Sequence, residues 1–235
     1  MEQLITGILE GLRLLFTGDP VLWEIILLSA RVSGIALVIS AVIGIPLGAL
    51  LGLVKFRGKR LIQALVYTGM GLPPVVVGLA VYLSLSRNGI FGAYNWSFLP
   101  DLFTVPAMVI AQVIIASPLV IGYTMSAISE INPELRLQVR ALGATRTQIT
   151  LTMLREARLG VIVALVGGLG SIISEVGAVM MVGGNVEGST RVLTTAIMLE
   201  TRRGNFGLAI GLGMVLLLLS FAINFGITQL QGKGN

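Results

Sequence analysis

Five long apolar stretches, separated by short polar segments, dominate the pattern of hydrophobic positions along this chain. A helix needs roughly 20 mainly apolar residues to cross roughly 30 Å of hydrocarbon, and each stretch reaches that length. We therefore predict five membrane-spanning helices, over residues 25–54, 61–85, 105–128, 159–182 and 208–230. The predicted fold class is all-α, a polytopic membrane helical bundle that forms a single transmembrane domain over residues 1–235.

Residues 1–20 show a different pattern. Apolar residues fall on one helical face and charged residues on the other, which predicts an amphipathic helix lying in the membrane interface or against the bundle. The apolar face carries Leu4, Ile5, Ile8, Leu12 and Leu15, opposed by Glu2, Glu10 and Arg13. The start of the chain lacks the basic segment and cleavage site of a secretory signal peptide, so we expect the first span to direct membrane insertion.

Composition agrees with a membrane protein and narrows its chemistry. Hydrophobic residues are 55% of the chain and charged residues 11%, whereas soluble domains contain about 25% charged residues. Cysteine and histidine are both absent from the sequence, which removes disulfides and the commonest metal ligand and general base. We predict no cofactor and no metal site. The net charge of +5 indicates basic loops beside a membrane rather than nucleic-acid binding.

The distribution of Lys and Arg predicts the orientation, because these residues concentrate in cytoplasmic loops. Residues 55–60 carry four cations, and the segment between the third and fourth spans carries five arginines. Both loops are therefore placed in the cytoplasm, with the N-terminus outside and the C-terminus inside. An outer loop with Arg191, Arg202 and Arg203 is an exception to this bias.

Small residues recur along the first span, where Gly44, Gly48 and Gly52 lie about one turn apart. Such a stripe lets two helix backbones approach closely. Two interpretations are open: packing within the chain, and contact between two copies of it.

The polar segment between the third and fourth spans has the pattern of a helix, a sharp turn and a second helix. Asn132 can cap the first helix, and Glu134 complements the positive end of its first turn. Gly143 suits a turn that needs a positive φ. Thr145 and Gln148 have the spacing of a capping box that starts the second helix.

The first of these helices has an apolar stripe of Leu135, Val139 and Leu142 and a basic flank of Arg136 and Arg140. A short amphipathic helix held out from the membrane suits a groove on a partner protein. A plain solvated connector is the alternative that periodicity alone leaves open.

Residues 140–144, Arg-Ala-Leu-Gly-Ala, resemble the core of the EAA loop found in permease subunits of bacterial ABC importers. In that family the loop forms a coupling helix that docks into a cleft on the ATPase subunit. The family's Glu-Ala-Ala positions are occupied here by Leu137, Gln138 and Val139.

Further segments resemble the molybdate, sulfate and tungstate permeases of that family, and together they cover residues 25–230. They are residues 71–78 (GLPPVVVG), 174–178 (SEVGA) with 183–185 (GGN), and 190–197 (TRVLTTAI) with 200–201 (ET). The last group and residues 154–158 (LREAR) are most similar to the tungstate branch.

The resemblance implies a type I ABC importer permease in the inner membrane that translocates an oxyanion. Tungstate is the first candidate substrate, and molybdate or sulfate is the next. It also implies a homodimer with the path at its two-fold axis, two ATPase subunits and an extracytoplasmic oxyanion-binding protein. The chain has no Gly-x-x-x-x-Gly-Lys-Ser/Thr loop, so ATP hydrolysis is expected in the partner and not here. The implied coupling loop is residues 132–147, with contacts from Glu134, Leu135, Val139, Arg140, Leu142, Gly143 and Ala144.

Two prolines interrupt the second predicted span. Pro73 and Pro74 lack an amide hydrogen and clash with the preceding turn, so the helix must kink or break there. A break inside the membrane is tolerated where the freed backbone groups face protein or a water-filled path. Pro73, Pro74 and Val77 are therefore candidates for the translocation path or gate, with a static kink as the alternative.

Two ionisable residues fall inside predicted spans, where a charge needs a partner or a function. Arg31 follows Trp23 by eight residues, and Glu175 follows Leu159 by sixteen. At about 1.5 Å per residue, their depths in the membrane differ by about one turn. We hypothesise that the two side chains form an intramembrane charge pair.

Two other function classes have less support. Ion-gradient-driven secondary anion carriers, the main alternative, often contain inverted repeats and proton-relay carboxylates; this chain has no convincing repeat and one deep carboxylate. An intramembrane enzyme would have to work without histidine, cysteine or paired membrane carboxylates.

Overall fold

The computed structural model describes residues 7–9, 13, 17, 19–91 and 99–232, which form helices and connections without a strand among them. The helices are α2 (Pro20–Leu53), α3 (Lys59–Met70), α4 (Pro74–Leu85), α5 (Val105–Ser129), α6 (Pro133–Ala141), α7 (Arg146–Glu156), α8 (Arg158–Ile173), α9 (Gly177–Gly183), α10 (Leu193–Arg202) and α11 (Phe206–Gly232). The amphipathic helix predicted over residues 1–20 lies largely outside the described residues.

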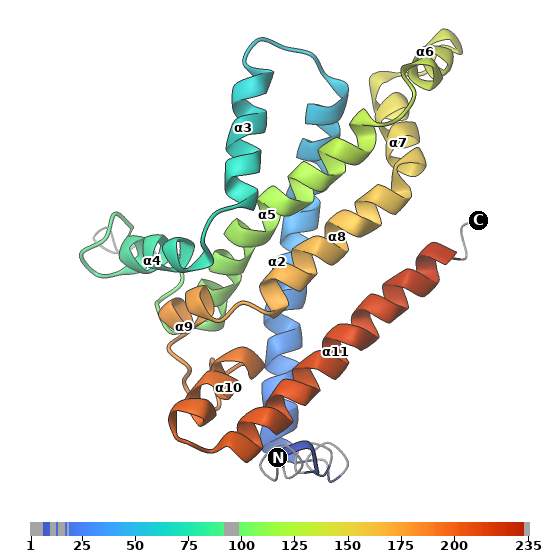
Figure 1. Ribbon diagram of the computed structural model, residues 1–235. Helices are drawn as coiled ribbons and strands as arrows, with labels where there is room; N and C mark the ends of the chain where they lie inside the picture. The colour runs from blue at the N-terminus through green and yellow to red at the C-terminus, as the bar shows by residue number, and fades with distance from the viewer. Residues whose placement is uncertain (1–6, 10–12, 14–16, 18, 92–98, 233–235) are drawn as a thin grey trace.

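Two long helices, α2 and α5, form the axis of the bundle, and α8 packs against both. Figure 1 shows α6, α7 and the connection between α2 and α3 at one end, with α10 and the start of α2 at the other. The main core lies between α2, α4, α5 and α9, where Val32, Met108 and Val179 are buried. The predicted all-α membrane bundle is confirmed.

Three of the five predicted spans are continuous helices, since α2, α5 and α11 are each long and apolar enough to cross a membrane. The other two predicted spans are broken. α3 and α4 meet at an angle of 98°, and residues 174–176 separate α8 from α9. A further bend of 71° separates α7 from α8.

Pro73 and Pro74 account for the first break. Pro73 has an extended backbone (φ −62°, ψ 121°) and caps α4, and Pro74 is the first residue of that helix. A proline is accommodated there because the first helical amides have no partner within the helix. The predicted interruption is thus confirmed, as a sharp turn rather than a shallow kink.

The glycine stripe of α2 packs against α5 in the same chain. A Cβ atom added at each glycine would meet α5 at less than 3 Å: 2.8 Å from Val120 Cγ1 at Gly44, 2.7 Å from the Ile121 carbonyl oxygen at Gly48, and 2.8 Å from Ile128 Cγ2 at Gly52. Only glycine permits this approach of the two backbones. Of the two interpretations of the stripe, packing within the chain is confirmed.

We predict that Gly48→Ala destabilises the chain, because the added methyl group meets a backbone oxygen that cannot move aside. Overpacking of this kind costs about 1–3 kcal/mol. Gly34→Ala is the matched control on the same helix, since nothing lies within 4 Å of its added Cβ, and it should be neutral or slightly stabilising. Thermal unfolding in detergent measures both. Equal losses of Tm would contradict the assigned α2–α5 contact.

Candidate functional site

Helices α6 and α7 form a hairpin that projects from one end of the bundle (Figure 1). Asn132 Oδ1 accepts a hydrogen bond from the Glu134 amide at 2.9 Å. The turn uses Gly143 at φ +79°. The Thr145 amide donates to Gln148 Oε1 at 2.8 Å, and the Gln148 amide donates to Thr145 Oγ1 at 3.3 Å. The predicted caps and turn are confirmed.

The apolar side chains of the hairpin differ in their exposure. Leu137 and Leu142 are 64% and 87% exposed, whereas Leu135 and Val139 are half-buried. The stripe of Leu135, Val139 and Leu142 therefore does not form one exposed face. Leu137, which was not assigned a contact from the sequence, belongs to the exposed apolar surface. Of the other predicted contact residues, Glu134, Arg140 and Gly143 are exposed and Ala144 is half-buried.

An arginine links the hairpin to the end of α2. Arg136 Nη1 donates to the carbonyl oxygen of Leu53 at 2.5 Å, and Leu53 is the last residue of α2. Carbonyl groups at a helix end lack partners within the helix and attract cations. The contact joins residues 83 positions apart, so sequence periodicity carried no signal for it.

Buried polar groups surround the break between α8 and α9. Gln112 of α5 is 3% exposed, and its Nε2 donates to the Ile172 carbonyl oxygen at 3.1 Å. Glu175 is 9% exposed, and its Oε1 accepts a hydrogen bond from the Ala178 amide at 2.9 Å. Glu175 thus satisfies an amide that a continuous helix would have paired internally, and Gln112 adds a second donor to the Ile172 carbonyl oxygen, which also accepts from the Glu175 amide.

Further hydrogen bonds connect this break to α10 and α2. Thr194 Oγ1 donates to the Glu175 carbonyl oxygen at 2.9 Å, and the Leu193 amide donates to Ser29 Oγ at 2.8 Å. All four residues are buried. The break between α8 and α9 is thereby held to α5, to α10 and, through α10, to α2. Ser29, Gln112 and Thr194 were not picked out from the sequence as parts of one network, because they come from distant segments.

The two broken spans meet where α4 packs against α9. A Cβ atom on Gly78 would lie 2.5 Å from Ala178 Cα, and one on Gly177 would lie 2.7 Å from Val75 Cγ2. Val77 is only 5% exposed and faces the core.

Other residues of the α3–α4 turn are open to the outside of the chain. Pro73 is exposed and Pro74 is half-buried. Val75 and Val76 are 55% and 54% exposed. The exposed side of the turn is thus formed by Pro73, Val75 and Val76 rather than by Val77.

The predicted pair of Arg31 and Glu175 is not formed. Among the described residues the ion pairs are Arg191 with Glu187 at 3.1 Å and Arg203 with Glu200 at 2.9 Å. Glu175 is used in capping α9, and Arg31 lies on the exposed side of α2. The prediction counted Glu175 along a continuous helix, whereas this residue lies in the break between α8 and α9.

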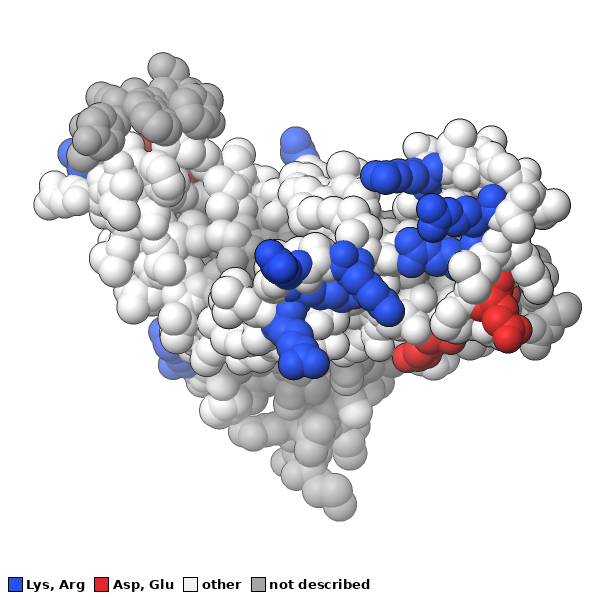
Figure 2. Space-filling model, turned by 90° about the horizontal axis from the view of Figure 1, so that it is seen from above, with Lys and Arg blue, Asp and Glu red and all other residues white. Residues whose placement is uncertain are grey.

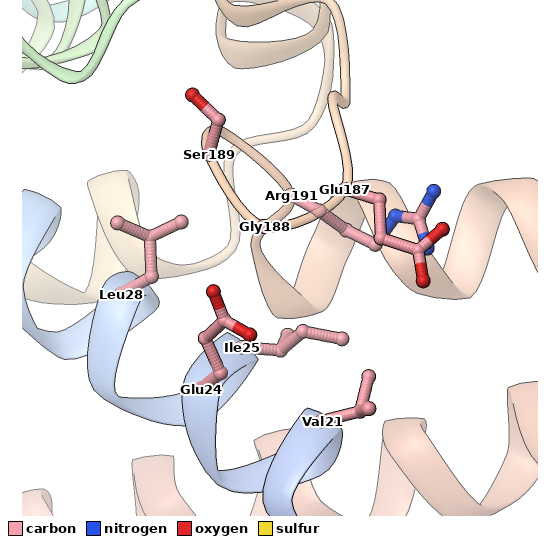
Figure 3. A pocket seen from close by; sticks show the side chains of 8 residues that line it. All are labelled: Val21, Glu24, Ile25, Leu28, Glu187, Gly188, Ser189 and Arg191. Atoms are coloured by element: carbon pink, nitrogen blue, oxygen red, sulfur yellow. The ribbon is translucent and has the colours of Figure 1, made fainter.

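At the end opposite α6, a cavity of about 140 Å³ lies between the start of α2 and the loop that follows α9. Figure 3 shows its lining residues, Val21, Glu24, Ile25, Leu28, Glu187, Gly188, Ser189 and Arg191. The loop is held by Thr190, whose Oγ1 donates to the Gly183 carbonyl oxygen and accepts from the Val186 amide. Two carboxylates and one guanidinium make the cavity mixed in charge, so it is not a simple anion pocket.

Comparison with known proteins gives a consistent result. Residues 44–232 match the family model described as "Binding-protein-dependent transport system inner membrane component". The chain is 41% identical over 231 residues to the tungstate uptake system permease protein of Peptoclostridium acidaminophilum, covering 98% of this chain and 99% of that protein. It is 31% identical to the molybdenum transport system permease protein of Escherichia coli K12, covering 84% and 91%.

Solved structures with the same fold are chains of ABC transporters. One, from inward-facing conformations of a methionine ABC transporter, has a TM-score of 0.69 at 20% identity and covers 90% of this chain and 93% of that chain. Another, from a bacterial importer of the acidic polysaccharide alginate, has a TM-score of 0.74 at 22% identity and covers 90% and 79%. At these identities the likeness concerns the fold.

We predict that Glu175→Ala destabilises the chain by about 1–3 kcal/mol, because the buried Ala178 amide loses its acceptor. Glu175→Gln keeps an acceptor oxygen at that place and should retain most of the stability. Glu187→Ala is the control: its carboxylate is 71% exposed, and exposed ion pairs contribute about 0–1 kcal/mol. Thermal unfolding of the purified variants compares the three, and similar Tm values for both Glu175 variants would refute the capping role.

Proposed function

We propose that this chain, which belongs to the family of binding-protein-dependent transport system inner membrane components, is the membrane permease subunit of an ATP-driven importer for tungstate. The alignment with a tungstate uptake permease over 98% of the chain supports this substrate. Molybdate and sulfate are the next candidate substrates, because permeases named for molybdenum and sulfate transport are 31% and 28% identical to this chain.

The α6–α7 hairpin is the surface that we assign to the ATPase subunit. It carries two exposed leucines, Leu137 and Leu142, beside the exposed Arg140. Large apolar side chains that are exposed on a rigid, capped hairpin need a partner to cover them. ATP binding and hydrolysis belong to that partner, since this chain lacks a phosphate-binding loop.

The hairpin end is placed in the cytoplasm, and the opposite end, with α10 and the loop after α9, faces the extracytoplasmic binding protein. The N-terminus then lies outside and the C-terminus inside. Nine Lys and Arg side chains at the hairpin end support this orientation, which follows the bias of basic residues toward the cytoplasm: Lys55, Arg57, Lys59, Arg60, Arg136, Arg140, Arg146, Arg155 and Arg158. Figure 2 shows cationic side chains gathered over this end.

Two copies of the chain form the transporter in this proposal, with the path between them. The exposed apolar residues of the α3–α4 turn support such a contact, because Val75 and Val76 lie beside a break in the backbone. Backbone freed inside a membrane is stable only against protein or a water-filled path. A second copy would supply that environment.

The fold suggests how ATP-driven movement reaches the break. α8 starts at Arg158, next to the hairpin, and ends at Ile173, next to the break. Because α8 is a continuous helix of 16 residues, a tilt of the hairpin moves its far end as a rigid lever. A shift of α9 against α4 would then switch access between the two sides of the membrane.

We predict that Leu137→Ala with Leu142→Ala weakens the complex with the ATPase subunit. Burial of one leucine side chain contributes roughly 1.5–3 kcal/mol, so each loss should raise Kd about 10-fold or more. The readout is affinity of the full-length permease for the purified ATPase. Leu61→Ala, at a leucine 67% exposed on α3, is the control that should keep wild-type affinity. A double variant that folds and binds normally would overturn the assigned surface.

Substrate identity has a separate prediction. Proteoliposomes that contain the permease, its ATPase and its binding protein should accumulate tungstate only with ATP, and unlabelled tungstate should compete better than molybdate or sulfate. Uptake that needs an ion gradient and not ATP would favour the secondary carrier instead.

A further inference from the structure

The connection between α2 and α3 is a dense group of positive charges. Lys55, Arg57, Lys59 and Arg60 fall within six residues, and all are exposed except Lys59, which is half-buried. The sequence contains no Asp or Glu between Glu24 and Asp101. Neither of the ion pairs in the described part of the chain involves these four cations. Their charge is therefore not neutralised by the chain itself.

This group lies at the level of the lipid headgroups. Lys55 follows α2 by two residues, and residues 32–54 before it carry no charge. At about 1.5 Å per residue this run is about 35 Å long, enough to cross roughly 30 Å of hydrocarbon, so the hydrocarbon region ends close to Lys55. Phe56 and Leu61 are 40% and 67% exposed, and aromatic and apolar side chains beside cations are typical of residues at a membrane interface.

The backbone adds to the positive potential. Helix α3 begins at Lys59 and has no side chain that caps its N-terminal amides. The N-terminus of a helix carries a partial positive charge. Lys59 and Arg60 are the first two residues of α3, so its positive end lies within the same run of cations.

We propose that Lys55, Arg57, Lys59 and Arg60 form a binding site for the phosphate group of an anionic phospholipid. Arginine binds a phosphate through two parallel hydrogen bonds, and lysine adds a mobile point charge. Clusters of cations directly beside a membrane span attract anionic lipids. The general bias of Lys and Arg toward the cytoplasm explains on which side of the membrane these residues lie. It does not explain why four of them gather at the start of α3.

The site also has a route to the rest of the protein. Leu53, two residues before Lys55, accepts the hydrogen bond from Arg136 that holds the α6–α7 hairpin. A lipid that orders the connection after α2 therefore stabilises the platform on which the hairpin rests. Anionic lipid should consequently hold the α6–α7 hairpin more firmly against the end of α2. This effect does not depend on which anion is transported.

The test is native mass spectrometry of the full-length chain, released from micelles doped with equal amounts of phosphatidylglycerol and phosphatidylcholine. The wild type should retain phosphatidylglycerol preferentially. The variant with Lys55, Arg57, Lys59 and Arg60 all changed to Gln should bind it about 10-fold more weakly. A matched variant, Arg87→Gln with Arg140→Gln, Arg146→Gln and Arg155→Gln, removes the same charge elsewhere and should keep wild-type preference.

Three outcomes would overturn the site. If both four-fold variants lose the same affinity for phosphatidylglycerol, the lipid is held by general electrostatic attraction and not by this site. Displacement of phosphatidylglycerol by millimolar inorganic phosphate or tungstate would assign the group to a free oxyanion instead. The variant with Lys55, Arg57, Lys59 and Arg60 changed to Gln is the third case. If it has the wild-type Tm and gel-filtration profile and still retains phosphatidylglycerol as the wild type does, the lipid binds elsewhere.

Discussion

Hydrogen bonding of the backbone inside the membrane is the constraint on which this structure depends. No water is available in hydrocarbon, so each amide and carbonyl must find a partner within protein. The chain nevertheless breaks two of its five spans. At the α8–α9 break, the buried Glu175 side chain supplies the acceptor for the Ala178 amide, and the buried Gln112 side chain donates a further hydrogen bond to the Ile172 carbonyl oxygen. At the α3–α4 break, the prolines remove the need for an amide partner at the start of α4.

These two breaks explain much of the remaining packing. Helices that end at mid-membrane are short, so they need close contact to stay in place. Gly78 and Ala178 provide that contact between α4 and α9, and Thr194 ties the same region to α10. The continuous helices α2 and α5 are joined instead by glycines that bring their backbones together. Rigid and discontinuous elements thus lie side by side, which is an arrangement suited to hinged movement.

Local features of the fold could be predicted from the sequence, and relations between distant helices could not. Five apolar stretches, the prolines and the caps at Asn132 and Thr145 depend on neighbouring residues, and the structure agrees with each. The Arg31–Glu175 pair failed because residue counting assumed a continuous helix, whereas Glu175 lies in the break before α9 and caps that helix. The hairpin shows the same limit: periodicity places Leu135 and Val139 on one helical face, but it does not tell how much of that face the rest of the fold covers. The family resemblance compensated for this by indicating function without geometry.

The placement of Glu175 also bears on the movement of an anion through such a protein. A carboxylate exposed along the path would repel an oxyanion, since like charges interact strongly where water is excluded. Glu175 is instead buried, with one oxygen bound to the Ala178 amide at the start of α9. The same side chain that makes the break possible is thereby kept out of the surface exposed by the chain. At the neighbouring α3–α4 turn the exposed side chains include Leu72, Pro73, Val75 and Val76, and none of them carries a charge. In the proposed transporter, an uncharged surface of this kind would favour passage of the anion over tight binding, and would leave selection of the anion to the binding protein.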